Sequence, residues 1–99
     1  MKTYNDIVDE ILSTDSAQRE RINNLIEFME LCITQAIKDD MYLVDIEIVK
    51  KHMPKYCQAY IINELKQSNW RFIIQKEDAN IIIIRFYLDR GNNTYDSKS

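Results

Sequence analysis

Histidine and cysteine, the side chains most often used as catalytic base and nucleophile, are scarce in this 99-residue chain, which has one histidine and two cysteines. The only histidine, His52, precedes Cys57 by five positions, so the two could form a thiol–imidazole pair. The second cysteine, Cys32, is distant from Cys57, and the chain has no C-x-x-C motif. We interpret both cysteines as reduced thiols of the core, with a disulfide or a reactive Cys–His pair as the alternatives. An enzyme built on His52, Cys57 and acidic neighbours is the least favoured hypothesis.

The counts of other residue types exclude the common nucleotide and metal sites. The single glycine, Gly91, lies near the C-terminus, so no glycine-rich turn can bring backbone amides up to a phosphate. One histidine cannot supply a two-histidine metal site, and no acidic stretch has the spacing of a calcium-binding loop. The sequence therefore predicts no catalytic residue, no metal and no cofactor, and it favours a non-enzymatic protein.

The composition predicts one small domain in a reducing compartment. Apolar residues make up 45% of the chain and charged residues 29%, which is typical of a single globular domain. No apolar run is long enough to cross a membrane, and the N-terminus lacks the apolar core of a signal peptide. We therefore expect a cytoplasmic protein without membrane contacts. Residues 1–90 form the predicted domain, and the polar residues 91–99 are expected to be a disordered tail.

The spacing of apolar residues predicts an α+β fold. Apolar residues recur at intervals of three and four over residues 4–12, 16–38 and 55–68, which is typical of amphipathic helices. Two alternating apolar runs at 70–75 and 81–88, separated by a short polar turn, predict an antiparallel β-hairpin.

Residues 43–49 fit two structures. Apolar side chains at every second position from Val44 to Ile48 predict a third strand that pairs with the hairpin. The same stretch also fits a short helix that Asp45 caps, with apolar residues on one face as far as Met53. Periodicity alone leaves both structures open.

The predicted hairpin is apolar on both of its faces. One face carries large side chains between Trp70 and Leu88, and we expect it to anchor the core. The opposite face carries Ile73, Ile81, Ile83 and Tyr87. A sheet that is apolar on both sides must be covered twice or must meet a partner. The short helix at 4–12 is one candidate for the second cover, and a partner or self-association surface is the other.

The long helix at 16–38 also carries more apolar surface than one core contact needs. Phe28 and Leu31 fall beside its main apolar stripe. Either this helix is a core element that packs on two sides, or Phe28 and Leu31 belong to a partner or self-association surface.

Charge is unevenly distributed along the chain, whose net charge is −3. Residues 1–47 hold four basic and eleven acidic side chains, whereas residues 48–76 hold six basic side chains and one acidic side chain. We therefore expect the folded protein to have a dipolar surface.

With a helix at 46–52, the order of elements in residues 45–88 resembles that of winged-helix domains, which is helix, turn, helix and hairpin. The resemblance implies a DNA-binding regulator whose second helix and wing contact the duplex. The nucleic-acid contacts would come from the basic segment 50–76, through Lys50, Lys51, Lys55, Gln58, Asn63, Lys66 and Lys76.

The helix-to-hairpin junction from Glu64 to Ile74, together with the scarcity of glycine and proline, resembles small accessory proteins of tailed bacteriophages. That resemblance implies a non-enzymatic protein in the host cytoplasm that binds and modulates a macromolecule. The main hypothesis is thus a small α+β binding protein, self-associating as a homodimer, that acts by occupying a partner protein. The alternative is the winged-helix-like DNA-binding regulator.

Overall fold

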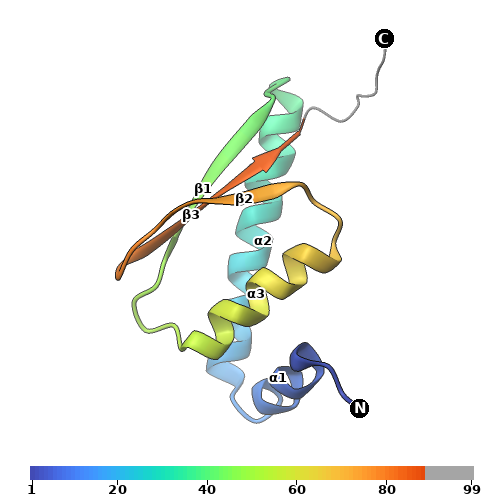
Figure 1. Ribbon diagram of the computed structural model, residues 1–99, viewed down its shortest axis with the longest axis vertical. Coiled ribbons are helices and arrows are strands. Elements are labelled where there is room, and N and C mark those ends of the chain that lie inside the picture. The colour runs from blue at the N-terminus through green and yellow to red at the C-terminus, as the bar shows by residue number, and fades with distance from the viewer. Residues whose placement is uncertain (89–99) are drawn as a thin grey trace.

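The computed structural model describes residues 1–88, which form two helices, a strand, a third helix and a hairpin of two strands (Figure 1). In chain order they are α1 (Tyr4–Leu12), α2 (Ser16–Lys38), β1 (Leu43–Val49), α3 (Lys55–Gln67), β2 (Phe72–Glu77) and β3 (Ile81–Tyr87). The predicted α+β class is confirmed, and so are the three helices and the hairpin. The tail predicted at residues 91–99 lies outside the described residues.

Residues 43–49 form a strand, so the strand interpretation is confirmed and the helical one is wrong. β1 pairs with β3 in antiparallel register along its full length. This pairing satisfies the backbone groups of the segment and buries Ile46 and Ile48. The helix expected at 46–52 is absent, and with it the first element of the winged-helix-like order.

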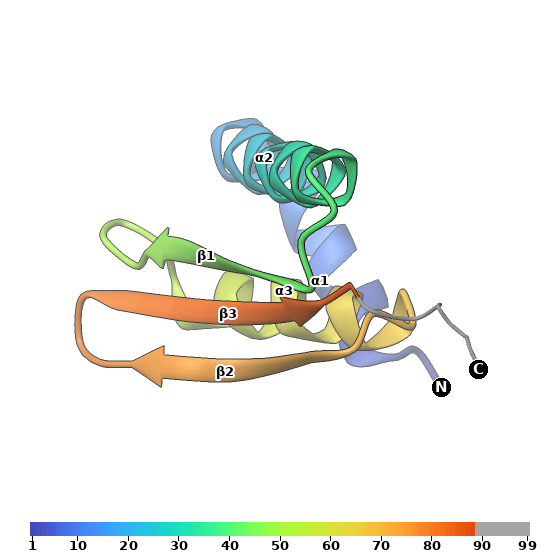
Figure 2. The same ribbon diagram turned by 90° about the horizontal axis from the view of Figure 1, so that it is seen from above.

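The sheet has the strand order β1-β3-β2, and both pairs of strands are antiparallel (Figure 2). We call the side that faces the helices the inner face. Ile82, Ile84 and Phe86 of the central strand are buried on it. The ring of Phe86 lies with its centroid 6.3 Å from that of Trp70 and 6.0 Å from that of Phe72. The hairpin face expected to anchor the core is therefore the inner face.

The two longer helices, α2 and α3, lie on the same side of the sheet, against its inner face. α3 lies behind the strands in Figure 2, and α2 runs along the β1 side. α2 is buried along one side only, through Ile22, Met29, Ile33 and Ala36. Phe28 and Leu31 of α2 are 50% and 69% exposed, so the interpretation of this helix as packed on two sides is wrong.

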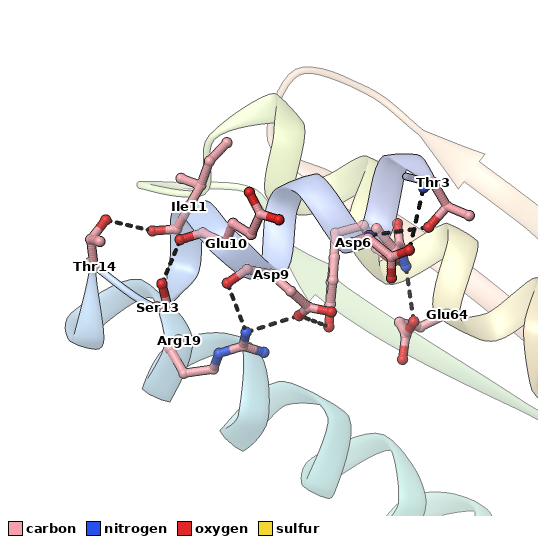
Figure 3. Close-up of polar contacts among 11 residues, drawn as sticks. Thr3, Asp6, Asp9, Glu10, Ile11, Ser13, Thr14, Arg19 and Glu64 are labelled. Atoms are coloured by element: carbon pink, nitrogen blue, oxygen red, sulfur yellow. Dashed lines mark hydrogen bonds and ion pairs between the residues drawn. The ribbon is translucent and has the colours of Figure 1, made fainter. Parts of the chain in front are cut away.

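α1 packs against α3 and α2, where polar contacts hold it (Figure 3). The side chain of Thr3 caps its first turn. The buried Asn5 donates a hydrogen bond from Nδ2 to the carbonyl of Tyr60 in α3. Arg19 of α2 donates to Oδ1 of Asp9 at 2.8 Å. α1 is thereby kept on the helical side of the molecule, and the idea that it covers the second face of the sheet is wrong.

Both cysteines are free thiols, as predicted. Cys57 is buried in the core and Cys32 is half-buried. Burial raises the pKa of the Cys57 thiol, so the protonated form is favoured. Among residues 1–88 no helix combines the length and the apolar content that crossing a bilayer requires.

Truncation of a side chain should cost far more stability on the inner face than on the opposite face. Ile84→Ala removes a side chain with 0% exposure, and we expect it to lower the free energy of unfolding by about 2–5 kcal/mol. Ile73→Ala, at a position that is 44% exposed, is the matched control and should cost under about 1 kcal/mol. Urea denaturation followed by circular dichroism measures both losses. Equal losses would contradict the assignment of the two faces.

Candidate functional site

No element of residues 1–88 covers the face of the sheet that points away from the helices, which we call the outer face (Figure 2). Antiparallel pairing sets its side chains in rows across the strands. Along β3 these rows are Val49–Ile81, Glu47–Ile83–Lys76, Asp45–Arg85–Ile73 and Leu43–Tyr87–Arg71. The outer face therefore combines apolar side chains from all three strands with charged side chains, of which Arg85 lies on the central strand.

The two edges of the outer face carry opposite charges. β1 contributes Asp45 and Glu47, whereas β2 contributes Lys76 and the adjoining Arg71. Glu47 and Lys76 lie in one row on either side of Ile83, since both are paired with it. An acidic edge and a basic edge thus border the central strand.

The charge on the central strand is compensated within the outer face. Arg85 donates from Nε and Nη2 to the two carboxylate oxygens of Asp45, at 2.8 and 3.0 Å. This bidentate pair lowers the pKa of Asp45 and raises the pKa of Arg85. In the next row the guanidinium of Arg71 lies 5.3 Å from the centre of the Tyr87 ring, within the range of a cation–π contact.

The structure divides the predicted partner residues between two surfaces. Ile73, Ile81, Ile83 and Tyr87 lie together on the outer face. Phe28 and Leu31 lie on the exposed side of α2. Sequence reasoning missed the exposed Val49, because its place on the outer face follows from the pairing of β1 with β3.

The residues predicted to contact nucleic acid lie partly around an open groove between α3 and β2. Lys55, Gln58 and Asn63 line it, with Ile62 and Ile74 as apolar neighbours. Lys50 lines it too. The carboxylate of Glu77 lines the groove as well and pairs with Lys50, so the groove combines apolar side chains with Lys55 and an ion pair.

Several of these predicted contacts already have partners within the protein. Lys50 donates from Nζ to a carboxylate oxygen of Glu77 at 3.2 Å and to the carbonyl of Asp78 at 2.8 Å. The side-chain amides of Gln58 and Asn63 also donate to groups of the same chain. Lys76 Nζ lies 3.9 Å from a carboxylate oxygen of Asp78, while Lys51, Lys55 and Lys66 are exposed. The amides best suited to reading bases are thus engaged in holding the fold.

The two members of the predicted thiol–imidazole pair lie in different environments. His52 is exposed in the turn before α3, where its φ is 64°, whereas Cys57 is buried. Within residues 1–88 no group of three or more His, Cys, Asp or Glu side chains is placed to hold a metal ion.

The Asp45–Arg85 pair should make the stability depend on pH in the acid range. Folding lowers the pKa of Asp45 from its ordinary value of 3.8, because Arg85 binds the ionised form. The pair therefore stabilises the fold above that pH, and its contribution is lost as the pH falls through the lowered pKa. Thermal unfolding between neutral pH and a pH of about 2 should show a smaller acid-induced loss for Asp45→Asn than for the wild type. Arg85→Gln should behave in the same way, and additive effects in the double variant would show that the two groups do not interact.

The outer face and the exposed side of α2 are thus the two surfaces on which the predicted partner residues lie. Comparisons with protein-family models, with curated proteins and with solved structures found no match.

Proposed function

We propose that the protein is a non-enzymatic binding protein that pairs with a second copy of itself through the outer face and occupies a partner protein with its helices. One observation carries the proposal, which is the order of side chains across the outer face. β1 carries Asp45 and Glu47, and β2 carries Lys76 next to Arg71. Between them β3 carries Ile81, Ile83 and Tyr87 together with Arg85, which is paired with Asp45. Removing such an apolar centre from water is favourable, and the charges at its edges determine how a second surface can be oriented.

A two-fold axis that lies between two outer faces and runs parallel to β3 brings opposite edges together. It sets β1 of each copy over β2 of the other, so that Glu47 faces Lys76 twice in the dimer. Ile83, between them in the same row, then meets the same residue of the second copy. An axis across the strands would instead set acidic edge against acidic edge. The charge order therefore favours one of the two symmetric arrangements.

The contact between two outer faces is small. Strands of six or seven residues, about 4.8 Å apart and rising about 3.3 Å per residue, give a face of roughly 14 by 22 Å. Stable dimers bury about 800 Å² per partner, so we expect this contact to hold two copies at micromolar or weaker affinity. In a dimer of that affinity, the charges at the edges contribute a measurable part of the binding free energy.

Pairing through the outer faces leaves the helices exposed on both sides of the dimer. The exposed Phe28 and Leu31 of α2 then remain accessible to a partner protein. In this arrangement the sheet joins the two copies, and the helices bind the partner protein.

Charge reversal at the edges tests the arrangement. Lys76→Glu or Glu47→Lys places like charges opposite each other twice per dimer, and we expect each change to raise the dimer dissociation constant about tenfold. The double variant restores opposite charges and should return the constant towards that of the wild type. Lys38→Glu, at an exposed position of α2, is the control for net charge. Sedimentation equilibrium over micromolar concentrations measures all five proteins.

Two outcomes would overturn the proposal. A wild-type protein that stays monomeric at high micromolar concentration would exclude self-association. If Lys38→Glu weakened the dimer as much as Lys76→Glu, or if the double variant were weaker than either single one, the edges would not face each other.

A further inference from the structure

A second surface feature lies between α2 and α3, on the helical side of the molecule. It is a slot with a volume of about 170 Å³ that is lined by Ile26, Met29, Glu30, Ile33, Ile61, Glu64, Leu65, Ser68 and Trp70. A cavity of roughly 150 Å³ is enough to admit a benzene molecule, so this slot has room for one side chain of a partner.

The slot is lined by apolar side chains and by two carboxylates. Its walls are apolar, formed by aliphatic side chains of both helices and by Trp70. Two carboxylates, Glu30 of α2 and Glu64 of α3, are the charged groups among its lining residues. Asn5 of α1 donates from Nδ2 to Oε2 of Glu64 at 2.9 Å, as the dashed contact to Glu64 in Figure 3 shows. α1 thus holds one carboxylate in position, whereas Glu30 lies on an exposed turn of α2.

We infer that this slot binds the side chain of a lysine on a basic segment of the partner protein. The methylene groups of a lysine fit an apolar wall, while its ammonium group stays beside the carboxylates, which can accept its hydrogen bonds. Among residues 1–88 no lysine or arginine lines the slot, so the described part of the chain places no cation there beside the two carboxylates. This inference rests on the proposed partner-binding function and is independent of the pairing of two copies.

The charge around the slot also favours a basic partner. The helices α1 and α2 carry six acidic and three basic side chains, and α3 adds Glu64 with Lys55 and Lys66, so the three helices together are negatively charged. Such an excess of negative charge attracts a basic segment at long range and repels an acidic one. An uncharged aliphatic side chain would fill the slot but would leave Glu30 and Glu64 without a cation.

Trp70 is the only tryptophan of the chain and lines the slot, so its emission can report on binding there. It also lies beside the outer-face residues Arg71 and Tyr87, so the glutamate variants below are needed to assign a change to the slot. The probe is a short alanine-based peptide with three lysines, and its matched control carries norleucine, which has a similar aliphatic chain without the ammonium group. We expect the lysine peptide to change the emission of Trp70 in a saturable manner and to bind at least tenfold more tightly than the norleucine peptide. Glu30→Gln and Glu64→Gln should each weaken the lysine peptide about three- to tenfold.

Glu27→Gln is the matched control, since it removes the same charge from an exposed position of α2 that does not line the slot. It should leave the affinity within about twofold of the wild type. Equal binding of the norleucine peptide would show an apolar pocket only, and equal weakening by Glu27→Gln and Glu30→Gln would show unspecific attraction. Either result, or an unchanged Trp70 emission, would overturn the inference.

The same titration with the Lys76→Glu variant separates this inference from self-association. Lys76 lies on β2 and does not line the slot, so the lysine peptide should bind this variant as it binds the wild type. A protein that dimerises but gives no peptide response refutes the slot alone. A monomeric protein that binds the peptide refutes the pairing of outer faces alone.

Discussion

The central position of β3 is the constraint on which the rest of the structure depends. Its inner face is apolar, with Ile84 and Phe86 among the most buried residues, and its outer face carries Ile81 and Ile83 next to the ion-paired Arg85. A chain of this length forms one core, and the described helices all lie on the same side of the sheet, which is the inner-face side. One face of β3 is therefore buried within the chain, and the other becomes the surface through which it can meet a second molecule.

Polar contacts between distant elements serve mainly to fix positions in this molecule. Exposed ion pairs contribute little to the free energy of unfolding. Here they fix the positions of side chains: Arg85 holds the carboxylate of Asp45 on the outer face, and Asn5 holds that of Glu64 beside the slot. Lys50 likewise ties the end of β1 to the tip of the β2–β3 hairpin. Groups that a partner can contact are thus oriented in the free protein, which reduces the entropy lost on binding.

Local patterns in the sequence predicted the elements and the two faces of the hairpin, because alternation is a property of neighbouring residues. They also predicted that Phe28 and Leu31 give α2 more apolar surface than one contact with the core can bury. The state of residues 43–49 could not be decided in that way, since a strand there depends on β3, which is distant in sequence. The slot was also beyond local reasoning, because Glu30 and Glu64 approach only when α2 and α3 pack together.

The strand order also has a consequence for the order of folding events. β2 and β3 are joined by a tight turn in which the carboxylate of Asp78 accepts hydrogen bonds from the backbone N–H groups of Asn80 and Ile81. This hairpin can close quickly, whereas β1 must reach β3 across the whole of α3 and β2. We expect the free edge of β3 to stay open until β1 arrives. At high concentration that open edge can accept the β1 segment of another chain, so rapid refolding of concentrated protein would favour strand-exchanged dimers.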